Sequence, residues 1–365
     1  MIIFSFPHPL NGNGPSRPIT RLWEAAHAAW GDRVLRVVPE DLPELSDTAR
    51  LGDAIGPCFD DLARERILSH HLSNTDGHVF IGGGAFLNQA RFLKTSAVGT
   101  GGAVVVSTWY SSYAEHAAKV LADEYRRWGI ERTPIHPYLI WRAKMEQGIS
   151  DTVIVPSEFC KSTYPKETRE KARVVEFGVD LDEFKPDMEA KPSPGLHVLI
   201  PATNPPRKGL AYASDAVDHL AHRDIRVTLT GSGQVGKLYT KDRLIQIGDA
   251  LGWVGNAEMR RLYQTSSVAL FPSIEEGQCL SALESMASGT PVIVTPECGH
   301  VITDGKEGFI VPSRDPAAIQ KALQYFIDNP SEVARMGREA RAYAERRPWS
   351  RFQAEFVRVV EEAAT

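Results

Sequence analysis

Two glutamates, Glu276 and Glu284, stand eight positions apart in FPSIEEGQCLSALESMASGTPVIV, residues 271–294. An apolar strand is expected to end at Phe271, a glycine-containing turn comes after it, and a helix is expected around Glu284. Free N–H groups at a helix start bind phosphate, and carboxylates accept hydrogen bonds from sugar hydroxyls. The segment therefore predicts a binding site for a phosphorylated, hydroxyl-rich ligand.

A second interpretation of the same residues is open. Ser281 and Glu284 have the spacing of a capping box, in which a serine N-cap and a glutamate at N3 satisfy N–H groups at a helix start. Glu276, next to Glu275, would in isolation be a solvated turn residue. Ligand binding and capping have to be weighed against the rest of the chain.

A pair of cations lies in a predicted strand-to-helix loop, where Arg207, Lys208 and Gly209 come after the apolar strand 197–201. Cations in such a loop can neutralise a diphosphate and stabilise it as a leaving group. The helix macrodipole disfavours positive charge at a helix start, which argues against a purely solvated role for them.

The apolar pattern predicts an α/β protein of two Rossmann-like, doubly wound domains. A chain of 365 residues exceeds one domain of ~150 residues. Its strands alternate with helices, which implies parallel sheets covered on both faces. A linker rich in Asp, Pro and Gly, 178–196, separates a domain at 1–178 from one at 196–346. The expected strands are 1–6, 34–38, 78–81, 103–107, 152–155 and 173–177, then 197–201, 226–230, 244–247, 268–271, 292–294 and 309–311.

Composition excludes several classes of function. A formal net charge of −5 gives no case for nucleic acid. Four cysteines far apart in the chain indicate reduced thiols. The N-terminus lacks a basic region, and no stretch approaches the roughly 18 apolar residues of a membrane span. We expect a cytoplasmic protein, peripheral to a membrane at most.

The motifs together resemble the retaining glycosyltransferases of family 4, which have the GT-B fold. Glu276 and Glu284 match the E-x7-E element of that family, and Lys208-Gly209 matches its lysine-glycine pair. The further matches are GVDLDEF at 178–184, the strand-loop around Pro156-Ser157, the Gly231-x-Gly turn, and a glycine-rich loop with Gly12 and Gly14. The resemblance implies two Rossmann-like domains facing a cleft, with a helix at 349–363 packing back on the first, acceptor-side domain.

The resemblance also implies roles for residues. Glu276 and Lys208 would be catalytic, with Glu276 on a hydroxyl of the donor sugar, and Glu284 would bind the ribose. Donor binding would further involve Arg207, backbone N–H groups of Gly277, Gln278, Cys279, Leu280 and Ser281, and the glycines Gly231 and Gly14.

The implied reaction moves a sugar, with retention of configuration, from a nucleoside diphosphate donor to a hydroxyl of a glycan, a lipid-linked acceptor or a small molecule. It would be a hexosyltransferase-type activity that uses no metal and no cofactor. Pro156-Ser157 and Asp180-Leu181-Asp182 are interpreted as structural, with Ser157 as a helix cap.

This chain departs from the family pattern at three places. Thr203 stands where an arginine is usual, Ser107-Thr108-Trp109 stands where many members have a histidine, and Cys279 stands where a glycine is common. Two other classes therefore stay open: a GT-B phosphorylase or sugar-nucleotide epimerase, and a non-catalytic protein that binds nucleotide-sugars.

A dinucleotide-binding interpretation is disfavoured. Gly231, Gly233 and Gly236 match G-x-G-x-x-G, and Asp249 could serve as the ribose-binding acid. Only thirteen residues separate the strands expected on either side, however. A dinucleotide-binding unit spans about 30 residues and needs a packed crossover helix.

A basic segment, KSTYPKETREKAR at 161–173, carries five basic and two acidic side chains. Such a patch attracts anionic headgroups, which permits peripheral contact with a membrane. A solvated, partly self-paired loop is the other interpretation.

Overall fold

The computed structural model describes residues 2–5, 17–37, 79–83, 104–131, 133–187, 195–220, 224–231, 248–300 and 302–365. The chain divides into two compact units. Unit 1 comprises Met1–Ala118, Thr133–Glu176 and Ser350–Thr365, and unit 2 comprises Lys119–Arg132 and Phe177–Trp349.

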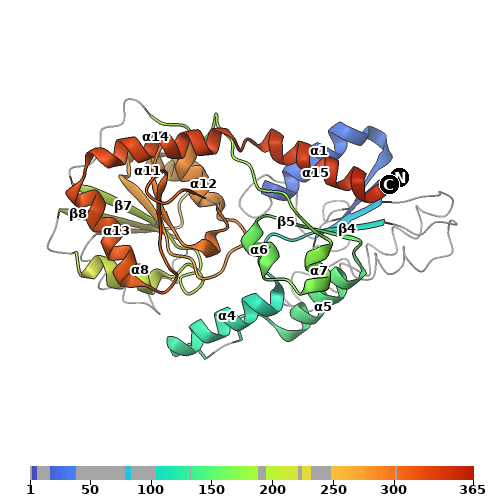
Figure 1. Cartoon of the computed structure of the whole chain (residues 1–365), viewed down its shortest axis with the longest axis horizontal. Coiled ribbons are helices and arrows are strands. Elements are labelled where there is room, and N and C mark those ends of the chain that lie inside the picture. Colours follow the sequence, from blue (N-terminus) through green and yellow to red (C-terminus); the bar gives the residue numbers. More distant parts are fainter. Residues whose placement is uncertain are drawn as a thin grey trace. The chain divides into compact units, whose positions relative to one another are not determined.

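Unit 1 is built on a parallel sheet of six described strands (Figure 1). Their order is β2-β1-β3-β4-β5-β6, so β1 lies between β2 and β3. The strands are β1 (Ile2–Ser5), β2 (Val34–Val37), β3 (Val79–Gly82), β4 (Val104–Thr108), β5 (Thr152–Val155) and β6 (Ala172–Val174).

Two helices from opposite ends of the chain pack together in unit 1. In α1 (Arg17–Trp30), Ile19, Leu22, Ala26 and Trp30 recur at helical spacing and are buried. In α15 (Trp349–Ala364), Phe356 meets Trp30 edge to face at 6.4 Å between ring centroids. The Gln353 amide also donates to the backbone oxygen of Arg21.

The remaining described helices of unit 1 come after β4 and β5. They are α4 (Ala114–Arg127), whose later residues belong to unit 2, α5 (Pro137–Ile149), α6 (Glu158–Ser162) and α7 (Lys166–Glu170). Ser157 is the N-cap of α6, since its hydroxyl accepts the N–H of Cys160 at 3.0 Å. The predicted cap is therefore confirmed.

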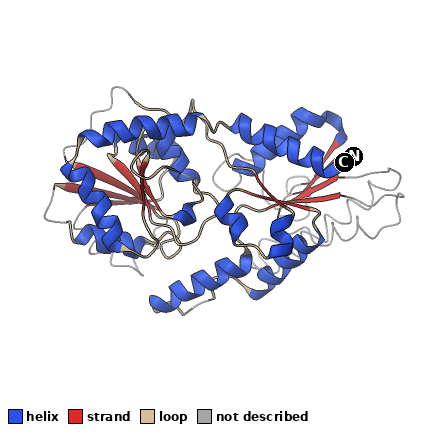
Figure 2. Ribbon diagram, viewed as in Figure 1, coloured by secondary structure: helices blue, strands red, loops and turns tan. Residues whose placement is uncertain are grey.

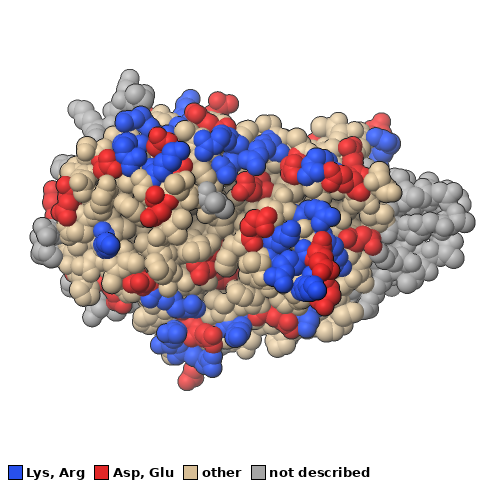
Figure 3. Space-filling view, viewed as in Figure 1, with Lys and Arg blue, Asp and Glu red and all other residues tan. Residues whose placement is uncertain are grey.

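The basic segment 161–173 covers the end of α6, all of α7 and the start of β6. Lys166 lies 3.9 Å from Glu170, and Lys171 donates to the backbone oxygens of Gly148 and Ser150. On the face seen in Figure 3, basic and acidic side chains are interleaved over α6 and α7. Part of the positive charge is thus paired locally.

Unit 2 is a second parallel sheet, with helices on both of its faces (Figure 2). The strand order is β12-β11-β10-β7-β8-β9. The strands are β7 (Leu196–Pro201), β8 (Ile225–Thr230), β9 (Gly248–Gly252), β10 (Val268–Phe271), β11 (Val292–Val294) and β12 (Gly308–Ile310).

The two faces of this sheet bury two different cores, because side chains alternate along a strand. In β7, Val198 and Ile200 join one core, while Leu199 joins the other. Helices α8 (Leu210–Asp218) and α13 (Pro316–Asp328) contribute to the first core. The second core takes side chains from α11 (Asn256–Thr265), α12 (Leu280–Ala287) and α14 (Ser331–Glu345).

The predicted α/β class with two parallel sheets is confirmed. Most described strands lie within one or two residues of their predicted bounds, and β5, β10 and β11 have the predicted bounds. The strand expected at 244–247 lies outside the described residues, and the strand found beside β8 is β9, at Gly248–Gly252.

Candidate functional site

The strand order of unit 2 fixes where a ligand can bind. The chain passes from β7 outward through β8 to β9, then returns to β10 and continues the other way through β11 to β12. In doubly wound sheets, ligands bind at the carboxyl ends of the strands where the order reverses. That point lies between β7 and β10, flanked by the loops 202–209 and 272–279.

These two loops are joined by their backbones. The N–H of Ile274 donates to the oxygen of Arg207 at 2.9 Å. Gly209 has a φ of 65°, and a Cβ on it would stand 2.0 Å from the oxygen of Pro272. Only glycine fits such an approach, so Gly209 allows the two loops to meet.

The junction brings together the cation–carboxylate cluster, which consists of Arg207, Lys208, Glu275 and Glu276. Arg207 donates through Nε to Glu275 Oε2 at 2.5 Å and through a terminal nitrogen to Glu276 Oε2 at 3.0 Å. Lys208 Nζ donates to Glu276 Oε1. The Ser273 hydroxyl also reaches Glu276 Oε1, at 3.4 Å.

The carboxylates of the cluster are buried, and three of its members have pKa values shifted by their neighbours. Both carboxylates are at most 5% exposed. Burial acts to raise the pKa of Glu276, but Lys208 and Arg207 outweigh it and hold that pKa below its ordinary value. Burial acts to lower the pKa of Lys208 and of Arg207, yet Glu276 raises both. Arg207 and Lys208 therefore stay cationic, and Glu276 stays anionic, at the switch point.

The helix that comes after the cluster begins two residues earlier than the capping box requires. Helix α12 starts at Leu280, and its N-cap is Cys279, whose side chain makes no capping bond. Ser281 is thus inside the helix, and the capping interpretation of Glu284 is wrong. The orphan N–H groups of the first turn include those of Leu280 and Ser281.

The Cys279 N–H is engaged elsewhere, since it donates to the backbone oxygen of Cys298 at 2.9 Å. This N–H is therefore not available to bind a nucleotide-sugar. Gln278 is held by its side chain, whose Oε1 accepts the N–H of Phe177 at 2.6 Å. Its Nε2 is buried without a hydrogen-bond partner, which leaves one donor for a ligand.

Glu284 lies on the next turn of α12 and is half-buried. The hydroxyl of Tyr263 donates to its Oε2 at 3.4 Å. Tyr263 is fully buried, and burial with the nearby Glu284 charge raises its pKa well above the ordinary value, so it remains a donor. Tyr263 therefore orients the Glu284 carboxylate.

Gly231 ends β8 on the same edge of the sheet. Its N–H donates to the oxygen of Gly252 at 2.7 Å, and a Cβ on it would stand 2.3 Å from the oxygen of Ala202. Close backbone approach thus accounts for this glycine. Gly233, Gly236 and the predicted donor-loop residue Gly14 lie outside the described residues.

Asp249, which would bind ribose in the dinucleotide-binding interpretation, is already paired. Asp249 accepts from Arg226 at 2.5 Å, and both side chains are more than half exposed. Asp180-Leu181-Asp182 has the spacing of a metal-binding D-x-D motif, but its role is structural. Asp180 Oδ1 accepts the N–H groups of Asp182 and Glu183. Within the described ranges, no group of three His, Cys, Asp or Glu side chains is placed to hold a metal ion.

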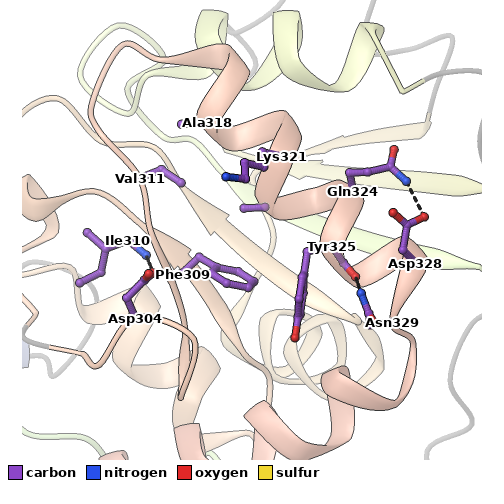
Figure 4. Close-up of a pocket in the computed structure, with 11 residues that line it drawn as sticks. Asp304, Phe309, Ile310, Val311, Ala318, Lys321, Gln324, Tyr325, Asp328 and Asn329 are labelled. Atoms are coloured by element: carbon purple, nitrogen blue, oxygen red, sulfur yellow. Dashed lines mark hydrogen bonds between the residues drawn. The ribbon is translucent and has the colours of Figure 1, made fainter.

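A cavity of about 520 Å³ lies beside α13 and β12, which is last in the strand order of this sheet (Figure 4). Tyr325 packs edge to face on Phe309 there, at 5.0 Å between ring centroids. Polar groups that line the cavity bond to one another. Gln324 donates to Asp328 at 2.7 Å, and the Asn329 side-chain amide donates to the backbone oxygen of Tyr325. None of the predicted site residues lines this cavity.

Two members of the site are not predicted by the sequence. Glu275, expected to be a solvated turn residue, is 2% exposed and bound to Arg207. No sequence pattern marks Tyr263. A signal for Glu275 existed in the two adjacent acids that face two adjacent cations, Arg207-Lys208, on the other loop.

Residues 197–329 match the family described as group 1 glycosyl transferases. Among curated proteins, the chain is 31% identical over 206 residues to a D-inositol 3-phosphate glycosyltransferase of Streptomyces avermitilis, covering 50% of this chain and 44% of that protein. It is 30% identical over 205 residues to an MMP alpha-(1->4)-mannosyltransferase of Mycolicibacterium hassiacum, covering 53% and 49%. The chain spans about half the length of these curated relatives.

Solved structures share the fold over nearly the whole chain. A sucrose-phosphate synthase from Thermosynechococcus elongatus superposes with a TM-score of 0.75 at 17% identity, over 99% of this chain and 98% of that one. HepE from Anabaena, in complex with UDP and glucose, gives a TM-score of 0.68 at 13% identity, over 99% and 100%. Residues 197–329 therefore resemble the group 1 glycosyltransferase family, and the chain as a whole has the GT-B fold.

Proposed function

We propose that this chain is a retaining glycosyltransferase of hexosyltransferase type, which moves a sugar from a nucleoside diphosphate donor to a hydroxyl acceptor. The observation that carries the proposal is the cation–carboxylate cluster at the switch point of unit 2, beside the start of α12. It lies inside the segment that matches the group 1 family.

Lys208 and Arg207 would bind the donor diphosphate together with the N–H groups at the start of α12. Both cations are paired with carboxylates in this structure, so an arriving diphosphate would share Lys208 with Glu276. Glu276 would then accept a hydrogen bond from a hydroxyl of the donor sugar, and the two positive charges would stabilise the departing diphosphate.

Glu284 would bind the ribose hydroxyls, oriented by Tyr263. Charged acceptors form stronger hydrogen bonds than neutral ones, which suits a carboxylate in this place. Gly231 would let the backbone lie close to the nucleotide. The preferred route is attack on the same face from which the diphosphate leaves, without a covalent adduct on Glu276.

The reaction would need neither metal nor cofactor, because Arg207 and Lys208 supply the positive charge that a divalent ion would otherwise bring to the diphosphate. The acceptor would be a glycan, a lipid-linked glycan or a small molecule, and nucleic acid is no partner. The proposed location is the cytoplasm, with contact at a membrane surface through residues 161–173. In the described part of the chain, no helix is long and apolar enough to cross a membrane.

A donor screen tests the proposal. The protein is incubated with a panel of nucleotide-sugars, with and without EDTA, and release of nucleoside diphosphate is measured. We expect one donor to be hydrolysed slowly and without metal dependence, and NMR of the transferred sugar to show retained configuration. Phosphate-dependent release of sugar phosphate would favour a phosphorylase, an exchanged sugar on intact nucleotide an epimerase, and binding without turnover a non-catalytic protein.

A further inference from the structure

Two cysteines adjoin each other next to the cation–carboxylate cluster. Cys279 precedes α12, and Cys298 ends the short 3-10 helix η6 (Pro296–Cys298) that comes after β11. Both are buried free thiols, and their backbones are joined by the hydrogen bond from Cys279 to Cys298. That bond, with the nitrogen and oxygen 2.9 Å apart, holds the two residues side by side, as a disulfide between them requires.

The thiols also interact directly. A hydrogen bond with the Cys298 thiol, and after it burial, raises the pKa of Cys279. Burial acts to raise the pKa of Cys298, but the hydrogen bond from Cys279 and contacts with Thr295 outweigh it and lower that pKa. Cys298 is thus the better nucleophile of the pair, because the thiolate is the reactive form.

We propose that Cys279 and Cys298 form a redox-active dithiol, which a peroxide converts into a disulfide and a dithiol reductant restores. The third described cysteine, Cys160, offers a contrast within the same chain. It is buried in unit 1, where its thiol donates to the backbone oxygen of Ser111 at 2.8 Å. Cys58 lies outside the described residues.

The chemistry balances with hydrogen peroxide as the oxidant. The Cys298 thiolate attacks one peroxide oxygen, the O–O bond breaks, and the other oxygen leaves as water once it is protonated. The Cys279 sulfur then attacks the sulfenic sulfur of Cys298, the S–O bond breaks, and a second water leaves with the Cys279 proton. Two thiols and one peroxide give one disulfide and two waters. Burial makes the reaction slow, so the protein should be treated with peroxide for hours.

Closing the disulfide would change the donor site, an effect that rests on the function proposed above. An S–S bond of about 2.05 Å is much shorter than the hydrogen bond between the two thiols, so closing it draws the sulfurs together. Cys298 would have to leave its contacts with the Phe271 oxygen at 3.2 Å and with Thr295 at 3.6 Å. Cys279 would move with the start of α12. We expect nucleoside diphosphate to bind about tenfold more weakly, as for one lost hydrogen bond to a charged group.

Peptide mass analysis of the full chain tests the dithiol independently of any activity. Trypsin cuts after Arg261 and Lys306 and at no site between, so one peptide, 262–306, holds both cysteines. After mild peroxide treatment of the folded protein, this peptide should have lost two hydrogens. Cleavage after Glu284 and Glu297 then separates the cysteines, and the two pieces should stay linked until a reductant is added.

Cys160 is the matched control, on the tryptic peptide 145–161, which should remain open to alkylation. Cys298→Ser should keep one alkylatable thiol in peptide 262–306 after peroxide. Two thiols that stay alkylatable in the wild type, or oxygen added to peptide 262–306 without loss of hydrogen, would overturn the proposal.

Nucleoside diphosphate binding by the reduced and oxidised proteins is the second measurement. Equal affinity of the two forms would overturn the effect on the donor site and leave the disulfide standing. Absence of binding in both forms would count against the proposed function, and the dithiol would then be judged on the peptide masses alone.

Discussion

The carboxyl edges of the two sheets carry different chemistry. In unit 2, β7 and β10 lead into loops that bury two cations against two carboxylates. In unit 1, β4 ends in Ser107 and Thr108, both buried, and Trp109 comes next. These groups are uncharged, and Thr108 has only a weak contact, 3.4 Å, with the Tyr110 hydroxyl.

In both sheets the described strand order reverses beside the first strand of the sheet. In unit 1 the order of the described strands reverses between β1 and β3, and the glycine-rich loop with Gly14 that comes after β1 lies outside the described residues. In unit 2 it reverses between β7 and β10, where the cluster stands. The charged switch point suits a diphosphate, while hydroxyls and an indole suit a neutral, hydroxyl-rich molecule.

Under the proposed function, the difference teaches that one scaffold binds donor and acceptor by changing only the loops at the carboxyl ends of its strands. Charges that stabilise a leaving diphosphate must be held in place beforehand, so they are buried and paired. A hydroxyl acceptor needs a fitting surface and few charges. Substitutions at both edges test that division, beginning with the largest expected effect.

Lys208→Ala should lower turnover by about 10²–10³-fold, because one preorganised charge on the leaving group is lost. Turnover at saturating donor is the measurement, and a thermal melt checks that the fold survives. Lys306→Ala removes a half-exposed lysine of the same unit and should leave turnover unchanged. Near-normal turnover of Lys208→Ala would remove the distinction between the two edges.

Gly209→Ala should destabilise unit 2 by about 2–4 kcal/mol, since it adds a clash with the Pro272 oxygen to a left-handed backbone. Gly148→Ala in α5 of unit 1 meets open space and should stabilise the protein by about 0.5–1 kcal/mol. Denaturant unfolding of both variants gives the comparison. Equal midpoints would mean that the loop junction is looser than the structure has it.

Glu284→Gln should weaken binding of free nucleoside diphosphate by about tenfold, because a charged acceptor becomes a neutral amide. Glu276→Gln should reduce transfer without weakening that binding, since it removes an anion that competes with the diphosphate for Lys208. Calorimetry with the free diphosphate, together with turnover of each variant, separates the two roles. Identical phenotypes would contradict the assignment of sugar and ribose to different glutamates.

Much of the fold was predictable from the sequence, because short apolar runs end at strong breakers. The strand β10 stops before Pro272, and β11 lies between Pro291 and the helix η6. The strand β9 was not predictable in the same way, since Gly248 and Gly252 give it little strand propensity and its pairing with β8 makes it a strand.

The candidate site was predictable as a set of residues but not as a set of contacts. The N-cap is expected at Ser281 because local capping patterns are visible in a sequence. The observed N-cap is Cys279, whose N–H donates to Cys298, a distant partner. Glu275 escapes prediction for the same reason, since Arg207 stands 68 positions away in the chain.

The smallest effect is expected at the surface of unit 1, in the basic segment 161–173. Exposed Lys166 is close to Glu170, which offsets part of its charge, while Lys171 donates to two neutral backbone oxygens and keeps its charge. Each free basic residue adds about 1 kcal/mol of attraction to an anionic surface. We therefore expect weak co-sedimentation with anionic vesicles at low salt, lost near physiological ionic strength because the charges are screened.

A charge-reversing pair, Arg169→Glu and Arg173→Glu, should abolish this binding, and both side chains are exposed. Arg226→Glu reverses an exposed charge of unit 2 as the matched control and should leave vesicle binding unchanged. Loss of binding in both proteins would assign the attraction to net charge and not to this segment. Failure of the wild type to co-sediment even at low salt would favour a soluble acceptor, because a lipid-linked one requires the enzyme to meet a membrane surface.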